Sequence, residues 1–512
     1  MHLPDLTAKR AEIDGDKIAL VDLATGTDIS YAALEERASR MAEFLRDEWG
    51  VERGTRVATL AHNRTETVEL LFACAKLHAV LVPLNWRLAV PELEYILTDA
   101  DAVGLINDEA NAIAAAELRA RVTGERGPLR SLAFGDSTLD CEAAYDTVLA
   151  QASGRQIVHE PRDEAELWYL MYTSGTTGNP KGVLQTAGMA LVNYLNIGTA
   201  ARITADDVFL SVLPQFHTGG WNLFALPMLF VGGTTLLPRT FDPAECLGLL
   251  QDRVSVFFGV PTIYQMLADH PDFTTTDLSN VRSWSSGGAA LPVPLLKRMD
   301  AAGIQVRQGM GMTETGPTVF LLDEDHAISK AGSVGMPQPF VDVRIVDEQG
   351  HDVPRGDRGE LVIRGPGVTP GYWRLPEATQ AAFEDGWLHS GDIARQDEDG
   401  YFYIVDRAKD MYISGGENVY PAEVEAVLLR YPGVAGAAVV GVPDDRWGEV
   451  GRAIIEASPG AAIDSAELID FSREHLARYK VPQHIDVIDE LPRNASGKIQ
   501  KHLLGTADGT SS

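Results

Sequence analysis

The chain has 512 residues, 45% of them apolar and 23% charged, which are the proportions of an ordinary folded protein rather than of a disordered or fibrous one. Acidic residues outnumber basic ones by 73 to 43, so the formal net charge is −30. This surplus argues against broad binding to nucleic acid or to an anionic membrane, because those polyanions attract clustered Lys and Arg. A small anionic ligand remains compatible with it, provided that a few cations and backbone amides gather at one site.

Cysteine usage and the hydrophobic segments indicate a cytoplasmic protein. Cys74, Cys141 and Cys246 are far apart and form no CxxC pair, which argues against a disulfide framework or a zinc site and favours reduced thiols. The N-terminal segment carries acidic residues and lacks the apolar core of a signal peptide. The apolar stretches 71–84 and 221–238 are both interrupted, so we expect no membrane insertion. The oligomeric state stays open, with a homodimer as one option.

Short β-rich runs alternate with helical patterns through the first two-thirds of the chain. The earliest clear helix is expected at 30–46, where Ser30 can cap the N-terminus and apolar residues recur on one face. A second helix is expected at 66–78. Strands are expected at 55–60, 79–83, 167–172, 208–213, 234–237, 255–259 and 281–285. This order predicts an α/β protein with parallel strands.

The pattern changes near residue 330. Alternating strands separated by Gly, Pro and Asp turns predict a small antiparallel barrel or sheet; they are expected at 341–346, 359–364 and 401–405. A charged segment follows, and after it an α+β pattern with helices at 421–430 and 465–478 and a strand at 437–442. We therefore place an N-terminal domain at 1–405, a hinge at 406–410, a C-terminal domain at 411–505 and a disordered tail at 506–512.

The segment after the strand at 167–172 has the composition of a phosphate-binding loop. Residues 173–182 read TSGTTGNPKG, with three glycines, four hydroxyls and one lysine. Glycines let backbone N–H groups approach phosphate oxygens, hydroxyls donate hydrogen bonds, and the lysine offsets negative charge. The segment is not a Walker A loop, which needs Gly where Pro180 stands and Ser or Thr where Gly182 stands. A solvated surface loop is the alternative.

This loop resembles the signature of the adenylate-forming superfamily, which includes acyl-CoA synthetases, aryl-CoA ligases, firefly luciferase and nonribosomal peptide adenylation domains. Further segments resemble the family's motifs and occur in the family's order: PQFHTGG at 214–220, SGGAA at 286–290, QGMGMTET at 308–315, WLHSGD at 387–392, VDRAKD at 405–410 and PRNASGK at 492–498. The resemblance implies an N-terminal domain of two layered α/β subdomains plus a small β-barrel, and a mobile α+β C-terminal domain.

The resemblance also implies the reaction. A carboxylate attacks the α-phosphorus of ATP to give an acyl-adenylate and pyrophosphate, and coenzyme A then takes the acyl group as a thioester. The first step brings two anions together, so catalysis must be chiefly positioning and charge stabilisation. The expected ligands are ATP, Mg²⁺, coenzyme A and a small-molecule carboxylic acid. Transfer to a carrier-protein phosphopantetheine is one alternative, and a non-catalytic ligand-binding member is another.

Roles for individual residues follow from the motifs that they match. The β- and γ-phosphates are assigned to Thr173, Ser174, Gly175, Thr176, Thr177, Gly178 and Lys181. Glu314 is assigned to Mg²⁺, Thr313 to the α-phosphate and Lys498 to the reacting phosphate and carboxylate. Asp392 and Arg407 are assigned to the ribose. The adenine site is assigned to Gly288, Ala289, Gln308, Gly309 and Met310, the last of which stands where the family usually has an aromatic residue. Taken alone, each of the charged residues would more simply be a turn, cap or surface residue.

The acyl pocket and the second step complete the set. By resemblance, His217, Trp221, Asn222 and Gly287 border the acid. Trp221 and the neighbouring Phe216 favour an apolar or aromatic tail, so we expect a medium- or long-chain fatty acid or an aryl(alkanoic) acid in preference to acetate. Lys409 is the expected hinge for rotation of the small domain. Gly415 and Gly416 are expected to line the pantetheine tunnel, where glycines let a thin thiol arm pass close to the backbone.

Overall fold

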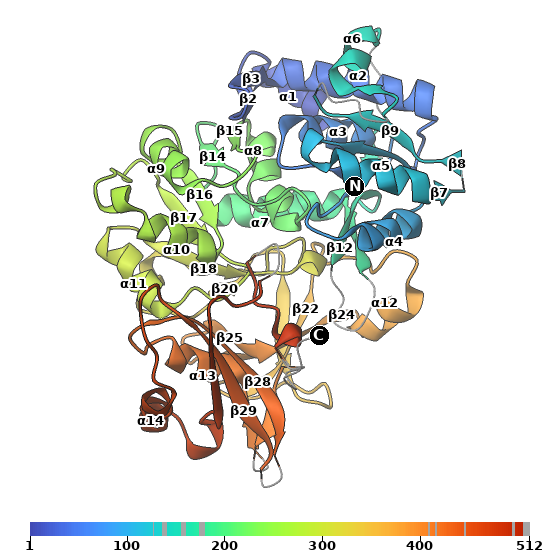
Figure 1. Ribbon diagram of the computed structural model, residues 1–512. Helices are drawn as coiled ribbons and strands as arrows, with labels where there is room; N and C mark the ends of the chain where they lie inside the picture. Colours follow the sequence, from blue (N-terminus) through green and yellow to red (C-terminus); the bar gives the residue numbers. More distant parts are fainter. Residues whose placement is uncertain are drawn as a thin grey trace.

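The structure of the chain, a computed structural model, describes residues 1–125, 127–135, 141–154, 160–173, 180–407, 410–414, 417–444, 447–493 and 497–504, without the side chains of residues 407, 417, 418 and 502. Two α/β units form the upper part of the molecule in Figure 1, a β-rich unit lies beneath them, and the C-terminal domain lies at the bottom. The expected tail at 506–512 lies outside the described residues.

The first sheet consists of β10 (Ala143–Ala144), β9 (Arg130–Ala133), β6 (Ala102–Asn107), β4 (Arg56–Leu60), β5 (Val80–Pro83), β12 (Leu167–Thr173) and β13 (Lys181–Thr186), in that order. The pairs are parallel except for the last, since β12 and β13 form an antiparallel hairpin. Two core clusters lie on its faces, one with helices α2 (Tyr31–Trp49) and α3 (Thr65–Lys76), the other with α4 (Val90–Ala100) and α5 (Ala112–Arg121). Burial on both faces explains why its strands are nearly all apolar.

The second sheet has the order β20 (Met336–Pro337), β19 (Phe320–Leu321), β18 (Val306–Met310), β17 (Ser283–Ser286), β16 (Val256–Gly259), β14 (Val208–Leu210), β15 (Thr234–Leu237), β2 (Ile18–Asp22) and β3 (Thr27–Ser30). Its inner strands are parallel, as predicted. Its helices are α7 (Ala187–Ala200), α8 (Ala225–Val231), α9 (Pro243–Asp252), α10 (Pro261–Asp269) and α11 (Val293–Ala301). Strand β15 lies on one side of β14 and β16 on the other, so the strand order reverses between β14 and β16.

A curled antiparallel half-barrel follows, in agreement with the predicted small barrel. It contains β21 (Asp342–Val346), β22 (Arg358–Arg364), β24 (Trp387–Gln396) and β23 (Phe383–Glu384), with β25 (Phe402–Arg407) paired to β24. Helix α12 (Pro376–Ala382) lies in the connection between β22 and β24. The apolar side chains of these strands share one core cluster with Val319, Phe320 and Val334, which come from the second α/β unit.

The C-terminal domain is an α+β unit with its own core. Its sheet has the order β27 (Glu417–Val419), β26 (Tyr412–Ser414), β29 (Gly448–Ala457) and β28 (Val434–Asp444), with β30 (His484–Ile488) beside β29. Helices α13 (Pro421–Leu428) and α14 (Ser465–His475) pack on it. The expected helix at 465–478 ends three residues early, and the sequence did not predict β29.

The remaining elements are shorter and do not position the candidate site. They are β1 (His2–Leu3), α1 (Leu6–Asp14), β7 (Thr123–Gly124), β8 (Gly127–Pro128), α6 (Tyr145–Gln151) and β11 (Arg162–Asp163). Cys74, Cys141 and Cys246 are free thiols. Within the described ranges, no helix has the length and apolarity needed to cross a membrane.

A partly buried ionic contact joins the last described turn to helix α13 of the C-terminal domain. The Lys501 ammonium lies 2.8 Å from Glu425 Oε1, which also accepts a hydrogen bond from the Val439 amide. Burial raises the pKa of the Glu425 carboxyl. Burial also works against the charged form of Lys501, but the carboxylates of Glu425 and Asp406 outweigh it and raise the pKa of Lys501. The Lys501 ammonium therefore offsets the negative charge of the Glu425 and Asp406 carboxylates.

Replacing this cation tests its structural role. We expect Lys501→Met to lower the free energy of unfolding by about 3 kcal/mol, because it leaves a buried carboxylate without its partner. Denaturant unfolding measures the change. Arg473→Met is the matched control, since Arg473 pairs with Asp470 at the surface and exposed pairs contribute about 0–1 kcal/mol. Equal effects of the two substitutions would contradict the assignment.

Candidate functional site

Several predicted motifs emerge from the same edge of the second sheet. Strands β16, β17 and β18 are parallel, with Gly259 opposite Ser286 and Ser286 opposite Gln308, so their carboxyl ends coincide. The turn at Gly287–Ala289 and the segment beginning at Gly309 follow directly. Gln308 Oε1 accepts a hydrogen bond of 3.0 Å from the Leu291 amide, which ties the two segments together. The carboxyl edge where a strand order reverses is the usual ligand site of an open α/β sheet.

The phosphate-binding loop connects the two strands of a hairpin. Thr173 ends β12 and lies opposite Lys181, the first residue of β13. Ser174, Gly175, Thr176, Thr177 and Gly178 lie outside the described residues. Further along β13, Gln185 Nε2 donates a hydrogen bond of 2.8 Å to the Thr313 carbonyl. The structure thus brings β13, the strand that follows the loop, to the Thr313–Glu314 segment, although the two belong to different sheets.

Gly311 and Met310, which precede Thr313 in the 308–315 segment, have distinct packing roles. A Cβ on Gly311 would coincide with the Pro317 carbonyl oxygen, so no larger residue fits without a backbone shift. Met310 is half-buried and packs against the half-barrel core. The close approach at Gly311 folds the chain back on itself and places Thr313–Thr315, a short 3₁₀ turn, beside β13.

Glu314 is buried and lies beside a residue that the sequence did not single out. Its Oε1 accepts a hydrogen bond of 3.0 Å from the Tyr372 hydroxyl, and its backbone carbonyl accepts one of 2.7 Å from the Thr369 amide. The Lys181 ammonium lies 5.2 Å from the centroid of the Tyr372 ring. Tyr372 is one of 14 tyrosines, and no local pattern distinguishes it from the others, because all these partners are distant in sequence.

The two residues assigned to the ribose lie opposite each other. Asp392 on β24 is the register partner of Arg407 on β25, and its side chain is buried. The bulge that carries Asp392 is held by Glu360, whose carboxylate accepts hydrogen bonds from the Gly391 amide at 3.0 Å and bonds His389 Nδ1 at 2.8 Å. The sheet pairing therefore brings these two distant motifs side by side.

The C-terminal domain contacts the same edge of the second sheet. A Cβ on Gly497 would lie 2.8 Å from Thr262 Oγ1, in the first turn of α10, so Gly497 and the exposed Lys498 lie at this corner. A second contact joins the domains: Arg358 of β22 lies 3.4 Å from Glu423 and 4.7 Å from the centroid of the Tyr420 ring. In this orientation the small domain faces the segment that follows β16.

His217 lies in a group of aromatic rings. Its ring centroid is 4.6 Å from that of Phe216, which is in edge contact with Trp86, and the Arg87 guanidinium lies 4.5 Å over the Trp86 ring. Burial, reinforced by the charge of Arg87, lowers the pKa of His217 to about 4. Its Nε2 and the indole N–H of buried Trp221 have no hydrogen-bond partner among the described residues. The imidazole is therefore neutral.

Asn222 has partners that differ from those expected. It is fully buried, its Oδ1 accepts a hydrogen bond of 2.5 Å from the Tyr169 hydroxyl, and its Nδ2 donates one of 2.7 Å to the Gly316 carbonyl. The Asn222 amide, which we expected to border the acid, is thus bonded to both α/β units beside Trp221. Lys409, Gly415 and Gly416 lie outside the described residues.

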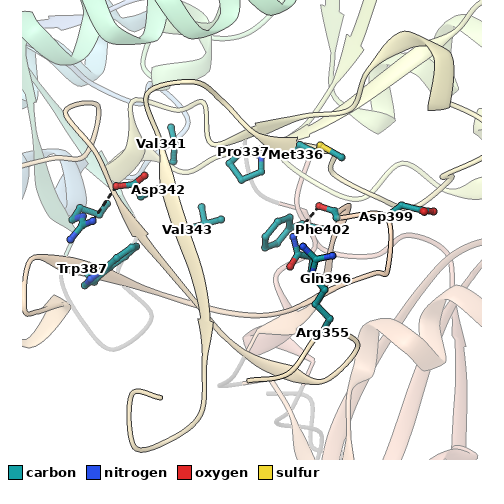
Figure 2. Close-up of a pocket in the computed structure, with 12 residues that line it drawn as sticks. Met336, Pro337, Val341, Asp342, Val343, Arg355, Trp387, Gln396, Asp399 and Phe402 are labelled. Carbon is teal, nitrogen blue, oxygen red and sulfur yellow. Dashed lines mark hydrogen bonds and ion pairs between the residues drawn. The ribbon is translucent and has the colours of Figure 1, made fainter. Parts of the chain in front are cut away.

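A hollow of about 730 Å³ lies away from all of these residues, on the half-barrel. Figure 2 shows Pro337, Val341, Val343 and Phe402 around it, with Trp387 and its neighbouring Asp342–Arg364 ion pair at one side. None of the predicted acyl-pocket residues lines it. The hollow is therefore separate from the edge where the motifs meet.

Two α/β sheets in contact at β13, a hydroxyl-rich segment between β12 and β13, and a small domain that contacts the carboxyl edge of the second sheet fit the architecture of an adenylate-forming enzyme. The chain belongs to the AMP-binding enzyme family, which matches residues 7–373, while the family's C-terminal domain matches residues 423–498. It is 44% identical to a feruloyl-CoA synthase of Amycolatopsis sp over 481 residues, 93% of each chain. It is 37% identical to an indoleacetate–CoA ligase of Aromatoleum aromaticum, covering 93% of this chain and 92% of the relative.

The fold agrees with that of a solved relative. The crystal structure of ATP-bound MatB from Rhodopseudomonas palustris matches with a TM-score of 0.90 and 34% identity, covering 98% of each chain. The protein is an AMP-forming acid–thiol ligase that uses ATP and coenzyme A to convert a carboxylic acid into its thioester. The expected reaction and its acceptor are thereby confirmed, and the carrier-protein and non-catalytic alternatives are not supported.

The lowered pKa of His217 predicts a pH effect on stability. The folded protein disfavours protonation of His217, so this group stabilises the fold fully above pH 6.5, and the contribution is lost as the pH falls towards about 4. As the pH falls from 6.5 to 4, the unfolding free energy of the parent should decrease by about 2 kcal/mol more than that of His217→Gln. Denaturant titrations at several pH values measure it.

The control is His351→Gln, because the His351 side chain is 79% exposed. We expect this variant to follow the parent curve. A His217→Gln curve parallel to that of the parent would show that the imidazole titrates normally in the folded protein.

Proposed function

We propose that the acid is an aryl or arylalkanoic carboxylic acid, with the hydroxycinnamates as the first class to examine. The observation that carries this is the aromatic group of Phe216, His217 and Trp86, in segments that follow β14 and β5, in which the imidazole is neutral and its Nε2 has no partner within the described chain. An apolar wall with one unpaired nitrogen suits a ring that bears a polar substituent. The names of the feruloyl- and indoleacetate-activating relatives support the same class. A medium- or long-chain fatty acid is the second candidate.

The first half-reaction needs its charges held in fixed positions. The carboxylate oxygen of the acid forms a bond to the α-phosphorus of ATP as the bond to pyrophosphate breaks. We assign the β- and γ-phosphates to the loop that starts at Thr173 and to Lys181, and the ribose to Asp392 and Arg407. Lys498 supplies positive charge between the carboxylate and the α-phosphate, where negative charge builds up in the transition state.

Glu314 suits Mg²⁺ by the chemistry of its surroundings. Its Oε2 has no partner among the described residues, and no cluster of three or more His, Cys, Asp or Glu side chains forms a complete metal site there. Mg²⁺ commonly takes one or two protein carboxylates and fills its octahedron with phosphate oxygens and waters. When bound with ATP, the ion would neutralise phosphate charge. We assign the α-phosphate to Thr313, which precedes Glu314 in the chain.

The second half-reaction transfers the acyl group. The thiol sulfur of coenzyme A forms a bond to the acyl carbon, and AMP leaves. We propose that the small domain rotates about Lys409 after the first step, which withdraws Lys498 and brings Gly415 and Gly416 to the adenylate. The interdomain pair of Arg358 and Glu423 is partly exposed, and such a pair contributes little free energy against a rotation. Free thiols and the use of coenzyme A support a cytoplasmic location.

The acid class is tested with a substrate panel. We expect kcat/KM for ferulate to exceed that for acetate by at least about 100-fold, with octanoate between them, because each buried apolar group adds roughly 10-fold or more in a fitted pocket. Coenzyme A-dependent AMP release measures the rates. A lead for acetate would overturn the proposal, and a lead for octanoate would select the second candidate.

The role of Lys498 is tested by separating the half-reactions. We expect Lys498→Ala to slow ATP–pyrophosphate exchange by about 10²–10³-fold, since it removes charge from the transition state. Thioester formation from presynthesised acyl-adenylate should remain nearly unchanged. Lys297→Ala, which removes an exposed lysine of α11, is the control for general effects.

The rotation predicts the opposite behaviour for a stiffened hinge. Lys409→Pro restricts the backbone at the proposed pivot, so we expect normal pyrophosphate exchange and a slow second step. Loss of both half-reactions in either Lys498→Ala or Lys409→Pro would show that the assignment of that lysine is wrong.

A further inference from the structure

Tyr372 touches two oppositely charged side chains that are both assigned to the triphosphate. Its hydroxyl donates to Glu314 Oε1 at 3.0 Å, and the Lys181 ammonium lies 5.2 Å from its ring centroid. Lys181 forms no ion pair with any carboxylate that the structure describes. One residue thus binds the anion through its hydroxyl and the cation through its ring, and it comes from the half-barrel rather than from either sheet.

The backbone of Tyr372 is fixed from both sides. The neighbouring Gly371 carbonyl accepts a hydrogen bond of 3.1 Å from the Leu184 amide, and the Trp373 amide donates one of 2.7 Å to the Gly182 carbonyl. These bonds attach the segment to β13 just beyond Lys181. The Tyr372 amide itself donates to Thr379 Oγ1 at 2.9 Å, in α12. A ring on so constrained a backbone can set the positions of flexible side chains around it.

The electrostatic problem at this point is the attraction between Lys181 and Glu314. If the two paired directly, each would neutralise the group that ATP needs, and nucleotide binding would first have to break a partly buried ion pair. The Tyr372 hydroxyl instead donates its hydrogen to the Glu314 carboxylate, with Oε1 as the acceptor. This hydrogen bond occupies Oε1 of Glu314 and does not involve the second carboxylate oxygen, Oε2.

We propose that Tyr372 is a positioning residue, which holds the Glu314 carboxylate and the Lys181 ammonium at separate places on either side of the triphosphate. The hydroxyl orients Glu314 towards the metal, and the ring keeps Lys181 in reach of the outer phosphates. The proposal rests on the assignment of Glu314 to Mg²⁺, and it adds the residue that prepares the site before ATP arrives.

Two substitutions separate the two contacts. Tyr372→Phe removes the hydroxyl and keeps the ring, so we expect the Mg²⁺ concentration for half-maximal pyrophosphate exchange to rise about 10-fold, the usual effect of losing a hydrogen bond to a charged group. The KM for ATP at saturating Mg²⁺ should change little. Tyr372→Leu removes both contacts and should also raise the KM for ATP by about 5-fold, because Lys181 loses its cation–π partner.

The controls exclude a merely structural effect. Tyr401→Phe removes a comparable hydroxyl that donates 2.7 Å to Asp323 on the half-barrel, and we expect its Mg²⁺ dependence to match that of the parent. Calorimetric titration of each folded variant with ATP, with and without Mg²⁺ and without acid, gives a readout that does not depend on turnover. At a subsaturating Mg²⁺ concentration, Tyr372→Phe should weaken binding of ATP, and it should leave binding of ATP without Mg²⁺ unchanged.

A double-mutant cycle tests whether Tyr372 acts through Glu314. In a Glu314→Gln background, Tyr372→Phe should have no further effect on Mg²⁺ dependence, because the carboxylate that it orients is gone. An unchanged Mg²⁺ requirement in Tyr372→Phe, or equal effects with and without Glu314, would overturn the role of Tyr372. If Glu314→Gln alone left the Mg²⁺ requirement unchanged, the metal assignment itself would be wrong, and the proposal for Tyr372 would fall with it.

Discussion

Repulsion between two anions is the constraint on which the organisation of this protein depends. The reaction brings a carboxylate to a triphosphate on a chain whose own formal charge is −30. Positive charge must therefore be concentrated at one place, and the cations assigned to the reaction come from three parts of the chain. Lys181 begins a strand of the first sheet, Arg407 ends a strand of the half-barrel, and Lys498 belongs to the C-terminal domain. Each of these cations therefore stands on a different structural unit.

The contact between the two α/β units and the half-barrel depends on a few hydrogen bonds at the edge of β13. Gln185 bonds the Thr313 carbonyl of the second sheet, while Thr369 bonds both the Leu184 and Glu314 carbonyls from the half-barrel loop. Three units thus meet on one strand, directly beyond the phosphate-binding loop. Because most of these bonds involve backbone groups, the geometry is fixed by the fold and tolerates different side chains nearby. Asn222 extends the same junction towards the acyl side by linking Tyr169 to Gly316.

The contrast between the junction and the domain interface fits a two-step reaction. Inside the N-terminal domain the links are buried and numerous, as around Asn222. Between the domains, the named contacts are the Arg358–Glu423 pair, the Arg358–Tyr420 ring contact and the approach of Gly497 to Thr262. Partly exposed pairs contribute little net free energy. Such an interface is compatible with the proposed rotation of the small domain, which has its own core cluster.

The sequence by itself determined the class of fold and the reaction, because these are written as local signals, and the same signals supplied the candidate site residues. Strand periodicity, the hydroxyl-rich loop at 173–182 and the ordered motifs up to Lys498 each occupy a few consecutive positions. The structure confirmed the parallel α/β units, the half-barrel and the separate C-terminal domain. Tertiary structure alone decided that β2 and β3 complete the second sheet, that Asp392 is the register partner of Arg407, that the Asn222 amide is bonded within the protein, and that Tyr372 touches both Glu314 and Lys181. Those facts depend on pairing and packing between residues tens to hundreds of positions apart, and no local pattern in one sequence records them.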